Sequence, residues 1–175
     1  AKGAAPGTEF RAISRQPGLL PGLLVATICL NCIDGANLSA TAGDLSRELT
    51  LDPKQMGVLL SSFFWSYMLC QIPSGWLIDR FNVYWVYAAG YFIWSLATAG
   101  GARATGIVSF IFARSLVGIG EAAYATIAPS LISDYFPPER RNRILTIFYV
   151  AIPVGSASGF ILGGAVGSAY GWRAA

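Results

Sequence analysis

The sequence has 175 residues, of which 54% are hydrophobic and only 12% are charged. This charged share is about half of that in soluble domains, so the composition excludes an ordinary soluble domain and indicates a membrane protein. The chain has a net charge of +3, no histidine, no phosphate loop and no zinc-protease motif, so we expect no metal, no cofactor and no enzymatic activity.

Five apolar segments are long enough to cross a membrane as helices. Residues 1–18 precede them and have no apolar period, so we expect a flexible tail on the cytoplasmic side. Residues 19–175 are expected to form an all-α, polytopic transmembrane helix bundle that packs through small residues. The five segments are roughly Leu19 to Leu45, Met56 to Ile78, Val83 to Gly100, Thr105 to Phe136 and Ile144 to Ala169.

Basic residues lie between these segments and form no arginine-rich face interleaved with aromatic rings, so we expect no nucleic-acid partner. Their distribution predicts the orientation, because cytoplasmic loops carry an excess of lysine and arginine. Seven basic residues flank one side and four flank the other, which predicts a cytoplasmic amino terminus. The seven are Lys2, Arg11, Arg15, Arg80, Arg140, Arg141 and Arg143, and the four are Arg47, Lys54, Arg103 and Arg173.

The first segment carries a polar ridge, because Asn31, Asp34 and Asn37 recur at every third position. A carboxylate at membrane depth costs about 2.5 to 3.5 kcal/mol on insertion scales, so Asp34 marks a candidate functional site. The two asparagines either line that site or hydrogen-bond a neighbouring helix. Cys29 and Cys32 have the spacing of a redox or zinc motif but lack partner ligands, so we interpret them as packing residues.

The second segment contains several hydroxyl groups, including Tyr67, which suit a cavity wall and helix packing equally well. It ends in Gly75-Trp-Leu-Ile-Asp79-Arg80, where glycine permits a close helix approach and the acid can satisfy N–H groups at another helix start. A turn with a surface salt bridge is the alternative. The third segment begins with residues that suit the headgroup boundary, namely Tyr84, Trp85 and Tyr87.

The fourth segment places a cation and an anion, Arg114 and Glu121, inside an apolar run. At about 100° per residue, these two residues and Gly118 share one helix face, which predicts that both charges point into the bundle. Such residues usually mark a substrate, ion or proton path, and a buried ion pair that only locks helices together is the alternative. The two backbones are about 10.5 Å apart along the axis, so a third partner such as Asp34 is expected.

The segment from Asp134 to Arg143 is predicted to be a loop that combines an acidic residue with the basic residues Arg140, Arg141 and Arg143. Its charges fit the positive-inside rule alone, but a conformational role is the interpretation that we favour. In the fifth segment, glycines recur at intervals of four and form a stripe along which two backbones can approach closely. These glycines are Gly155, Gly159, Gly163 and Gly167.

Several of these runs carry a family resemblance. The run Arg114-Ser-Leu-Val-Gly-Ile-Gly-Glu121-Ala resembles the fourth helix of major facilitator superfamily transporters, and within them the Spinster-like branch. The run from Asn31 to Ser39 resembles the first-helix signature of Spinster-like and organic-anion facilitators, with Gly35 where an arginine is usual. Gly75 to Arg80 resembles the superfamily's cytoplasmic motif, and Ile147 to Ser156 resembles the fifth helix of the Spinster-like branch.

The resemblance implies a fold of twelve helices, of which this chain would hold five from the amino-terminal half, with the carboxyl-terminal half as its missing partner. It implies a secondary active transporter that works by proton-coupled alternating access. The expected substrate is an amphipathic lysolipid or sphingoid-type molecule or an organic anion. An importer of small organic anions, such as a sugar acid or carboxylate symporter, is the alternative, and a channel or membrane-embedded enzyme is a remote one.

The resemblance also implies roles for individual residues, in a multi-pass protein of a bacterial inner membrane that contacts membrane lipids. Asp34 and Glu121 would exchange protons, and Arg114 would hold an anionic substrate. The other expected substrate-binding residues are Asn31, Asn37, Tyr67 and Tyr124. The expected conformational elements are Gly75, Asp79 and Arg80 at one turn and Asp134, Arg140, Arg141 and Arg143 at the next.

Overall fold

The computed structural model describes residues 19–175, and this part of the chain forms five α-helices. The predicted tail at residues 1–18, with Lys2, Arg11 and Arg15, lies outside the described residues. The helices are α2 (Leu19–Glu48), α3 (Pro53–Arg80), α4 (Val83–Gly101), α5 (Ile107–Tyr135) and α6 (Pro138–Tyr170). The expected all-α bundle is thereby confirmed.

Four helices, α2, α3, α5 and α6, are long and apolar enough to cross a membrane. The fifth, α4, has 19 residues and contains three tyrosines and two tryptophans. Its length still matches the roughly 20 residues that a membrane-spanning helix needs. The five predicted segments therefore correspond to five helices, of which four satisfy the length and hydropathy criteria.

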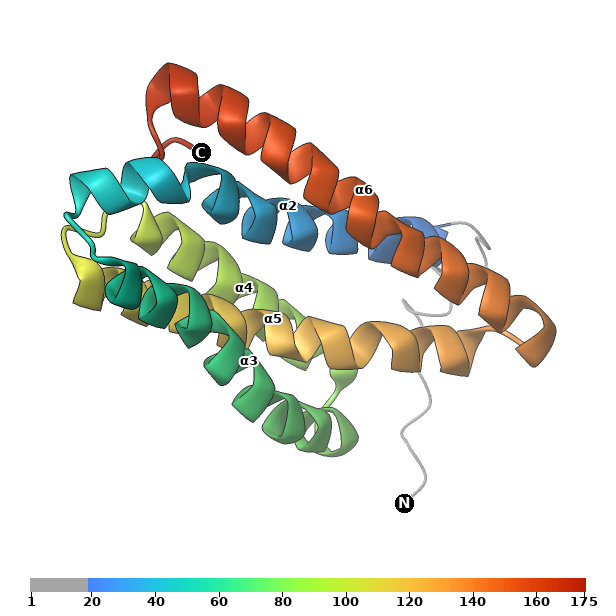
Figure 1. The fold of residues 1–175 in the computed structure, drawn as a ribbon. Coiled ribbons are helices and arrows are strands. Elements are labelled where there is room, and N and C mark those ends of the chain that lie inside the picture. Colours follow the sequence, from blue (N-terminus) through green and yellow to red (C-terminus); the bar gives the residue numbers. More distant parts are fainter. Residues whose placement is uncertain (1–18) are drawn as a thin grey trace.

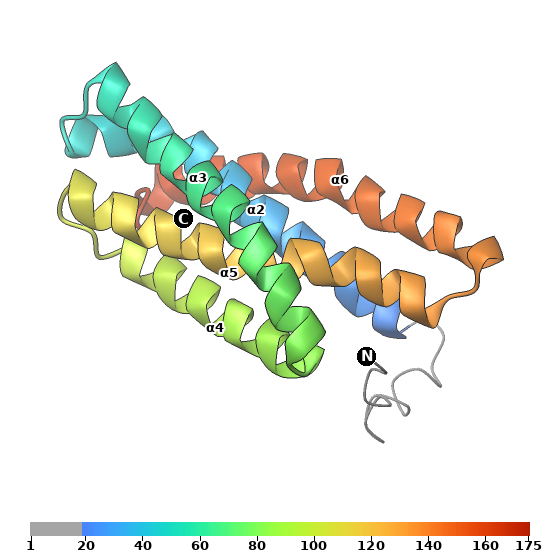
Figure 2. The same ribbon diagram turned by 90° about the horizontal axis from the view of Figure 1, so that it is seen from below.

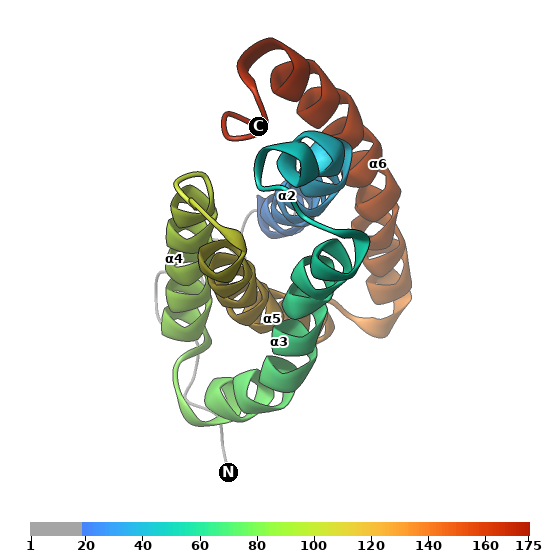
Figure 3. The same ribbon diagram turned by 60° about the vertical axis from the view of Figure 1, so that its left-hand side comes forward.

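Helix α5 is at the centre of one group, because α3 and α4 both pack along it, whereas α2 packs mainly on α6. Figure 3 shows α5 between α3 and α4, with α2 beside α6, and Figure 2 shows α4 running alongside α5. The helices alternate in direction. The turns at 49–52 and 102–106 lie at the same end as the residues after α6, and those at 81–82 and 136–137 lie towards the other end (Figure 1).

The start of α3 is set by local chemistry. The Asp52 carboxylate accepts a hydrogen bond from the Gln55 backbone N–H at 2.7 Å, and the Gln55 side chain accepts one from Asp52 N–H at 3.0 Å. This reciprocal capping box satisfies N–H groups that would otherwise lack a partner, and Pro53 suits the first helical position. The helix therefore starts three residues before the predicted Met56.

The prediction of a loop from Asp134 to Arg143 was wrong for most of that segment. Asp134 is still in α5, and α6 already begins at Pro138, so the three arginines lie in its first turns. The reason is that proline at the first helical position loses no hydrogen bond, and Glu139 interacts favourably with the helix start. Only residues 136 and 137 connect the two helices.

Two apolar clusters hold the ends of the bundle together. Leu24, Tyr124, Ile132 and Phe148 belong to the cluster where α2 begins and α5 ends. The second cluster, at the opposite end, joins α2, α3 and α5 with Trp172 from the residues after α6; its buried members are Leu45, Leu59, Ala104, Phe110 and Trp172. The polar residues of the first and fourth predicted segments lie between these two clusters.

Candidate functional site

An ion pair joins α2 and α5 in the middle of the bundle. The Arg114 Nη1 atom lies 3.5 Å from Asp34 Oδ2, across 80 residues of sequence. The two side chains are 11% and 18% exposed, so solvent screens the pair much less than it would at the surface. The structure thus places Asp34 in the position of the third partner that the spacing of Arg114 and Glu121 requires.

Arg114 has further donors that this pair does not use. Its guanidinium carbon lies 5.1 Å from the centre of the Phe63 ring on α3, which is a cation–π distance. Its Nε–H is fully enclosed and has no hydrogen-bond partner within residues 19–175. Arginine carries five N–H donors in a planar fork, so Arg114 retains donors for a carboxylate or phosphate group.

Glycine brings α3 close to this face of α5. A Cβ atom on Gly118 would lie 2.6 Å from the Phe63 carbonyl oxygen and 3.1 Å from the Tyr67 nitrogen, so only glycine fits. The Tyr67 ring stacks on the Phe63 ring with centroids 5.6 Å apart. Tyr67 is half-buried and lies on the same side of the bundle as the charged residues, with Glu121 among its electrostatic neighbours.

Glu121 is the most enclosed charged residue of the site, with 5% of its surface exposed. Its electrostatic neighbours are Asp34, Arg114 and the Asn31 side chain, which hydrogen-bonds to it. The structure therefore gathers both carboxyl groups, the arginine and Asn31 between α2 and α5. One arginine cannot neutralise two carboxylates. One of the two carboxyl groups is therefore suited to binding a proton.

Trp94 on α4 is a member of the site that sequence reasoning missed. Its indole Nε1 donates to Asp34 Oδ2 at 3.5 Å, the same oxygen that Arg114 contacts. The sequence offered a weak signal, since a tryptophan inside an apolar helix usually needs an acceptor for its N–H group. It could not show which acceptor.

A cavity of about 240 Å³ opens beside the ion pair. Arg114 and Asp34 form part of its wall, and apolar side chains from α4 and α5, such as Ala97 and Val117, form much of the rest. Asn37 and the residues after α6, including Trp172 and Arg173, complete the lining. The cavity therefore combines a charged region with an apolar wall.

The predicted polar ridge on α2 does not face one way. Steps of three residues turn a helix by about 300°, so successive members of the ridge rotate by roughly 60°. Asn31 and Asp34 accordingly face α5, whereas Asn37 packs against Gly163 of α6 and donates to the Ala175 carbonyl through Nδ2. Asn37 reaches the cavity from a different side.

Tyr124 lies away from the charged centre. Its hydroxyl donates to the Leu24 carbonyl at 2.7 Å, and only 4% of the residue is exposed. Its ring packs against Tyr87 and Phe148, with centroids 5.9 and 6.3 Å away. The hydroxyl of Tyr124, which was predicted to contact substrate, therefore already has a hydrogen-bond acceptor. The residue belongs to the apolar cluster at the start of α2.

The predicted conformational elements lie at that same end of the bundle. Gly75, Asp79 and Arg80 end α3, where Asp79 and Arg80 are exposed and the Arg80 guanidinium lies 5.5 Å from the Trp76 ring centre. Near the start of α6, Arg141 Nη2 donates to the Ser133 carbonyl of α5 at 2.5 Å and thus ties the two helices together. The neighbouring residues Asp134, Arg140 and Arg143 are exposed.

The glycine stripe of α6 faces α2, and all four of its glycines are buried. A Cβ atom on Gly155 would lie 2.8 Å from the Cys29 carbonyl oxygen, and one on Gly167 would lie 2.8 Å from the Thr41 methyl carbon. Gly159 and Gly163 make equally close approaches between these two positions. The α2–α6 contact therefore runs along the helices without space for side chains.

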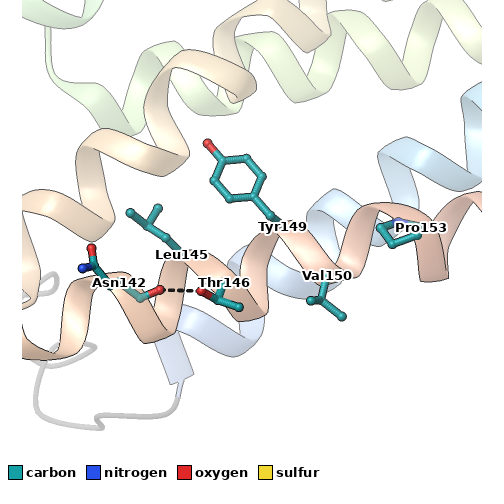
Figure 4. A pocket seen from close by; sticks show the side chains of 6 residues that line it. All are labelled: Asn142, Leu145, Thr146, Tyr149, Val150 and Pro153. Atoms are coloured by element: carbon teal, nitrogen blue, oxygen red, sulfur yellow. Dashed lines mark hydrogen bonds between the residues drawn. The ribbon is translucent and has the colours of Figure 1, made fainter.

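A larger hollow of about 530 Å³ runs along one face of α6 (Figure 4). It is lined by Asn142, Leu145, Thr146, Tyr149, Val150 and Pro153. All six come from one helix, and the dashed bond in Figure 4 is the local one from the Thr146 hydroxyl to the Asn142 carbonyl. This hollow has no charged lining and is separate from the site.

The sequence matches the Major Facilitator Superfamily over residues 24–175. It is 38% identical over 167 residues to human protein spinster homolog 1, a match that covers 90% of this chain and 32% of the human protein. It is 39% identical over 156 residues to protein spinster of Drosophila melanogaster, covering 89% of this chain and 26% of that protein. It is also 34% identical over 163 residues to the sphingosine-1-phosphate transporter of Danio rerio, covering 90% and 32%.

Solved structures show the same relationship. A bacterial homolog of the human lysosomal transporter Spinster, in an inward-facing and unoccupied conformation, superposes with a TM-score of 0.79 at 29% identity. The match covers 84% of this chain and 31% of that protein. The chain thus spans about a third of the length of these relatives. Its helices, its motifs and these matches show that the chain belongs to the Major Facilitator Superfamily and resembles its Spinster-like members.

Proposed function

We propose that the protein containing this chain is a proton-coupled secondary active transporter that works by alternating access. The observation that carries the proposal is the enclosed Arg114–Asp34 pair, with Glu121 nearby, beside a cavity at the middle of the bundle. Transporters of this kind bind substrate and coupling ion near the membrane midplane, between two halves that rock around the site. In this chain the ion pair lies between the two apolar clusters at the ends of the bundle, which supports a midplane site.

The proposed cycle uses the charges in turn. The Arg114 guanidinium turns from Asp34 to an anionic substrate group, so Asp34 loses its cation. A carboxylate without a partner in this setting is costly, so proton uptake by Asp34 or Glu121 accompanies substrate binding. Release of the substrate restores the ion pair and expels the proton, which couples the two movements.

The proposed substrate is an amphipathic anion of the lysolipid or sphingoid type. The cavity offers a cation beside an apolar wall, which matches a molecule with an anionic head and an alkyl chain. The similarity to a protein named as a sphingosine-1-phosphate transporter supports the same class. Asn31 and Tyr67, which lie near the carboxyl groups, are proposed to contact the head group, and Asn37 to line the cavity.

The proposed partner is a second six-helix half of the same protein. Large apolar side chains along α3 are exposed, among them Ile72 at 83% and Leu69 at 65%. We propose that membrane lipids and the second half cover these apolar surfaces. We further propose that Gly75, Asp79 and Arg80, together with Asp134, Arg140, Arg141 and Arg143, contact that half at the cytoplasmic side. The protein would lie in a bacterial inner membrane with its amino terminus in the cytoplasm.

The test is transport by the full-length protein in liposomes with an imposed pH gradient. Uptake of labelled sphingosine-1-phosphate is compared with uptake of gluconate, a sugar acid. We expect saturable accumulation of the first that disappears when a protonophore collapses the gradient. Gluconate accumulation would instead favour an importer of small organic anions, and non-saturable flux of both would contradict a transporter mechanism.

A further inference from the structure

The Asp34 carboxylate has two donors from two different helices. Arg114 Nη1 on α5 and Trp94 Nε1 on α4 both lie 3.5 Å from Oδ2. Neither contact is short, since N–H···O hydrogen bonds usually measure about 2.9 to 3.0 Å. One donor is charged and belongs to the proposed substrate site, and the other is neutral and donates at every pH.

The position of Trp94 depends on a close crossing of α4 and α5. A Cβ atom on Gly120 would lie 2.6 Å from the Gly90 carbonyl oxygen and 2.8 Å from the Trp94 nitrogen. A Cβ atom on Gly90 would in turn lie 2.9 Å from the Gly120 carbonyl oxygen. The Tyr91 ring, 5.2 Å from the Trp94 ring, packs edge-on against it. Backbone contact and ring packing thus hold the indole towards α2.

We propose that Trp94 is a positioning residue that holds the Asp34 carboxylate while Arg114 is engaged with the anionic substrate. This inference rests on the proposed function. When the guanidinium turns to the substrate, Asp34 loses its charged donor, but the Trp94 N–H remains in place. The carboxylate therefore stays where a proton can reach it and where Arg114 returns after substrate release.

The surroundings of Asp34 leave this task to Trp94. From α5, the charged groups are Arg114 and Glu121, and Glu121 repels the Asp34 carboxylate. From α6, Gly155 and Gly159 pack against the α2 backbone at Cys29 and Ile33, and the Ser156 side chain hydrogen-bonds to Cys32. Other titratable groups nearby are Tyr67 of α3, Tyr91 of α4 and Cys32 of α2, and each of them interacts electrostatically with Glu121.

The first test is a double-mutant cycle in the full-length protein. Thermal unfolding midpoints at pH 8 are measured for wild type, Trp94→Phe, Asp34→Asn and the double variant, without any ligand. Phenylalanine keeps a ring and removes the donor. We expect Trp94→Phe to lower the midpoint about twice as much with Asp34 as with asparagine, because bonds to charged acceptors are roughly twice as strong as neutral ones. Equal effects in both backgrounds would show that Trp94 acts by packing alone and would overturn the proposal.

The second test measures binding of sphingosine-1-phosphate at pH 8. Trp94→Phe should weaken it by up to about tenfold, because the Trp94 bond to Asp34 is worth more once Arg114 has turned away and Asp34 has lost its charged donor. The matched control is Trp85→Phe, because Trp85 lies on the same helix and is 73% exposed; it should leave binding unchanged. If Arg114→Ala abolishes binding and Trp94→Phe leaves it unaltered, the positioning role is wrong. If wild type does not bind this lipid, the proposed substrate is wrong, and the unfolding cycle alone decides the role of Trp94.

Discussion

Gly159 of α6 and Ile33 of α2 lie so close that a Cβ atom on Gly159 would be 2.7 Å from the Ile33 carbonyl oxygen. We therefore expect Gly159→Leu to force the two helices apart and to destabilise the protein by at least about 1 to 3 kcal/mol, the usual cost of overpacking. Transport in liposomes should be lost with it. The measurement is the thermal unfolding midpoint of the full-length protein in detergent.

The matched control for this change is Gly164→Leu. Gly164 is exposed on the same helix, and a Cβ atom there meets no atom of residues 19–175 within 4 Å. It should leave the midpoint and transport close to wild type. An equal loss in both variants would mean that leucine harms α6 itself, and the close contact with α2 would not be the cause.

Asp34→Asn is expected to separate substrate binding from proton coupling. The amide keeps the shape of the side chain but cannot take up and release a proton, so pH-driven accumulation should be lost while downhill exchange remains. Glu121→Gln should weaken both, because Glu121 is the more enclosed carboxyl group and interacts with both Asp34 and Arg114. Asp44→Asn, at a side chain 56% exposed, is the control. Full accumulation by Asp34→Asn would place the coupling at Glu121 or in the other half.

Arg114→Ala is expected to have the largest effect of the site variants. It removes the cation and leaves the Asp34 carboxylate enclosed without its charge partner, which costs about 3 to 5 kcal/mol in buried pairs. Arg114→Lys keeps the charge but lacks the planar fork, so it should bind substrate weakly and keep more stability. The readouts are substrate affinity and the unfolding midpoint, with the exposed Arg103→Ala as control. Wild-type affinity in Arg114→Ala would remove this residue from the substrate site.

Tyr124→Phe is expected to change stability and not substrate affinity. It removes the hydrogen bond from the hydroxyl to the Leu24 carbonyl, a loss of about 1 kcal/mol, while the ring stays packed. A lower unfolding midpoint with unchanged binding of sphingosine-1-phosphate would agree with this expectation. A weaker affinity with an unchanged midpoint would instead support the direct substrate contact that the family resemblance implies.

The orientation of the bundle can be measured with single cysteines at its two ends. Arg143 and Arg103 are exposed at opposite ends, and both can be replaced by cysteine in a background without Cys29, Cys32 and Cys70. We expect an impermeant thiol reagent to label position 103 in intact cells and position 143 only after permeabilisation. The reverse pattern would place the amino terminus outside the cytoplasm. It would contradict the orientation predicted from the excess of basic residues on the side of Arg143.

The sequence by itself determined the helices and the residues that carry charge into them. Apolar length and helical periodicity depend only on neighbours along the chain, so the five segments and the common face of Arg114 and Glu121 could be predicted. The boundaries were less certain where a cap or a proline decides them, as at Asp52 and Pro138.

Only the tertiary structure decided which groups from different helices meet. Periodicity gives the face of a residue on its own helix, but the rotation and crossing of two helices depend on close backbone contacts such as Gly90 with Gly120. That crossing brings Trp94 to Asp34, a contact for which the sequence has no local signal. The same reason turns Asn37 towards α6, because a helix of 3.6 residues per turn cannot keep every third residue on one face.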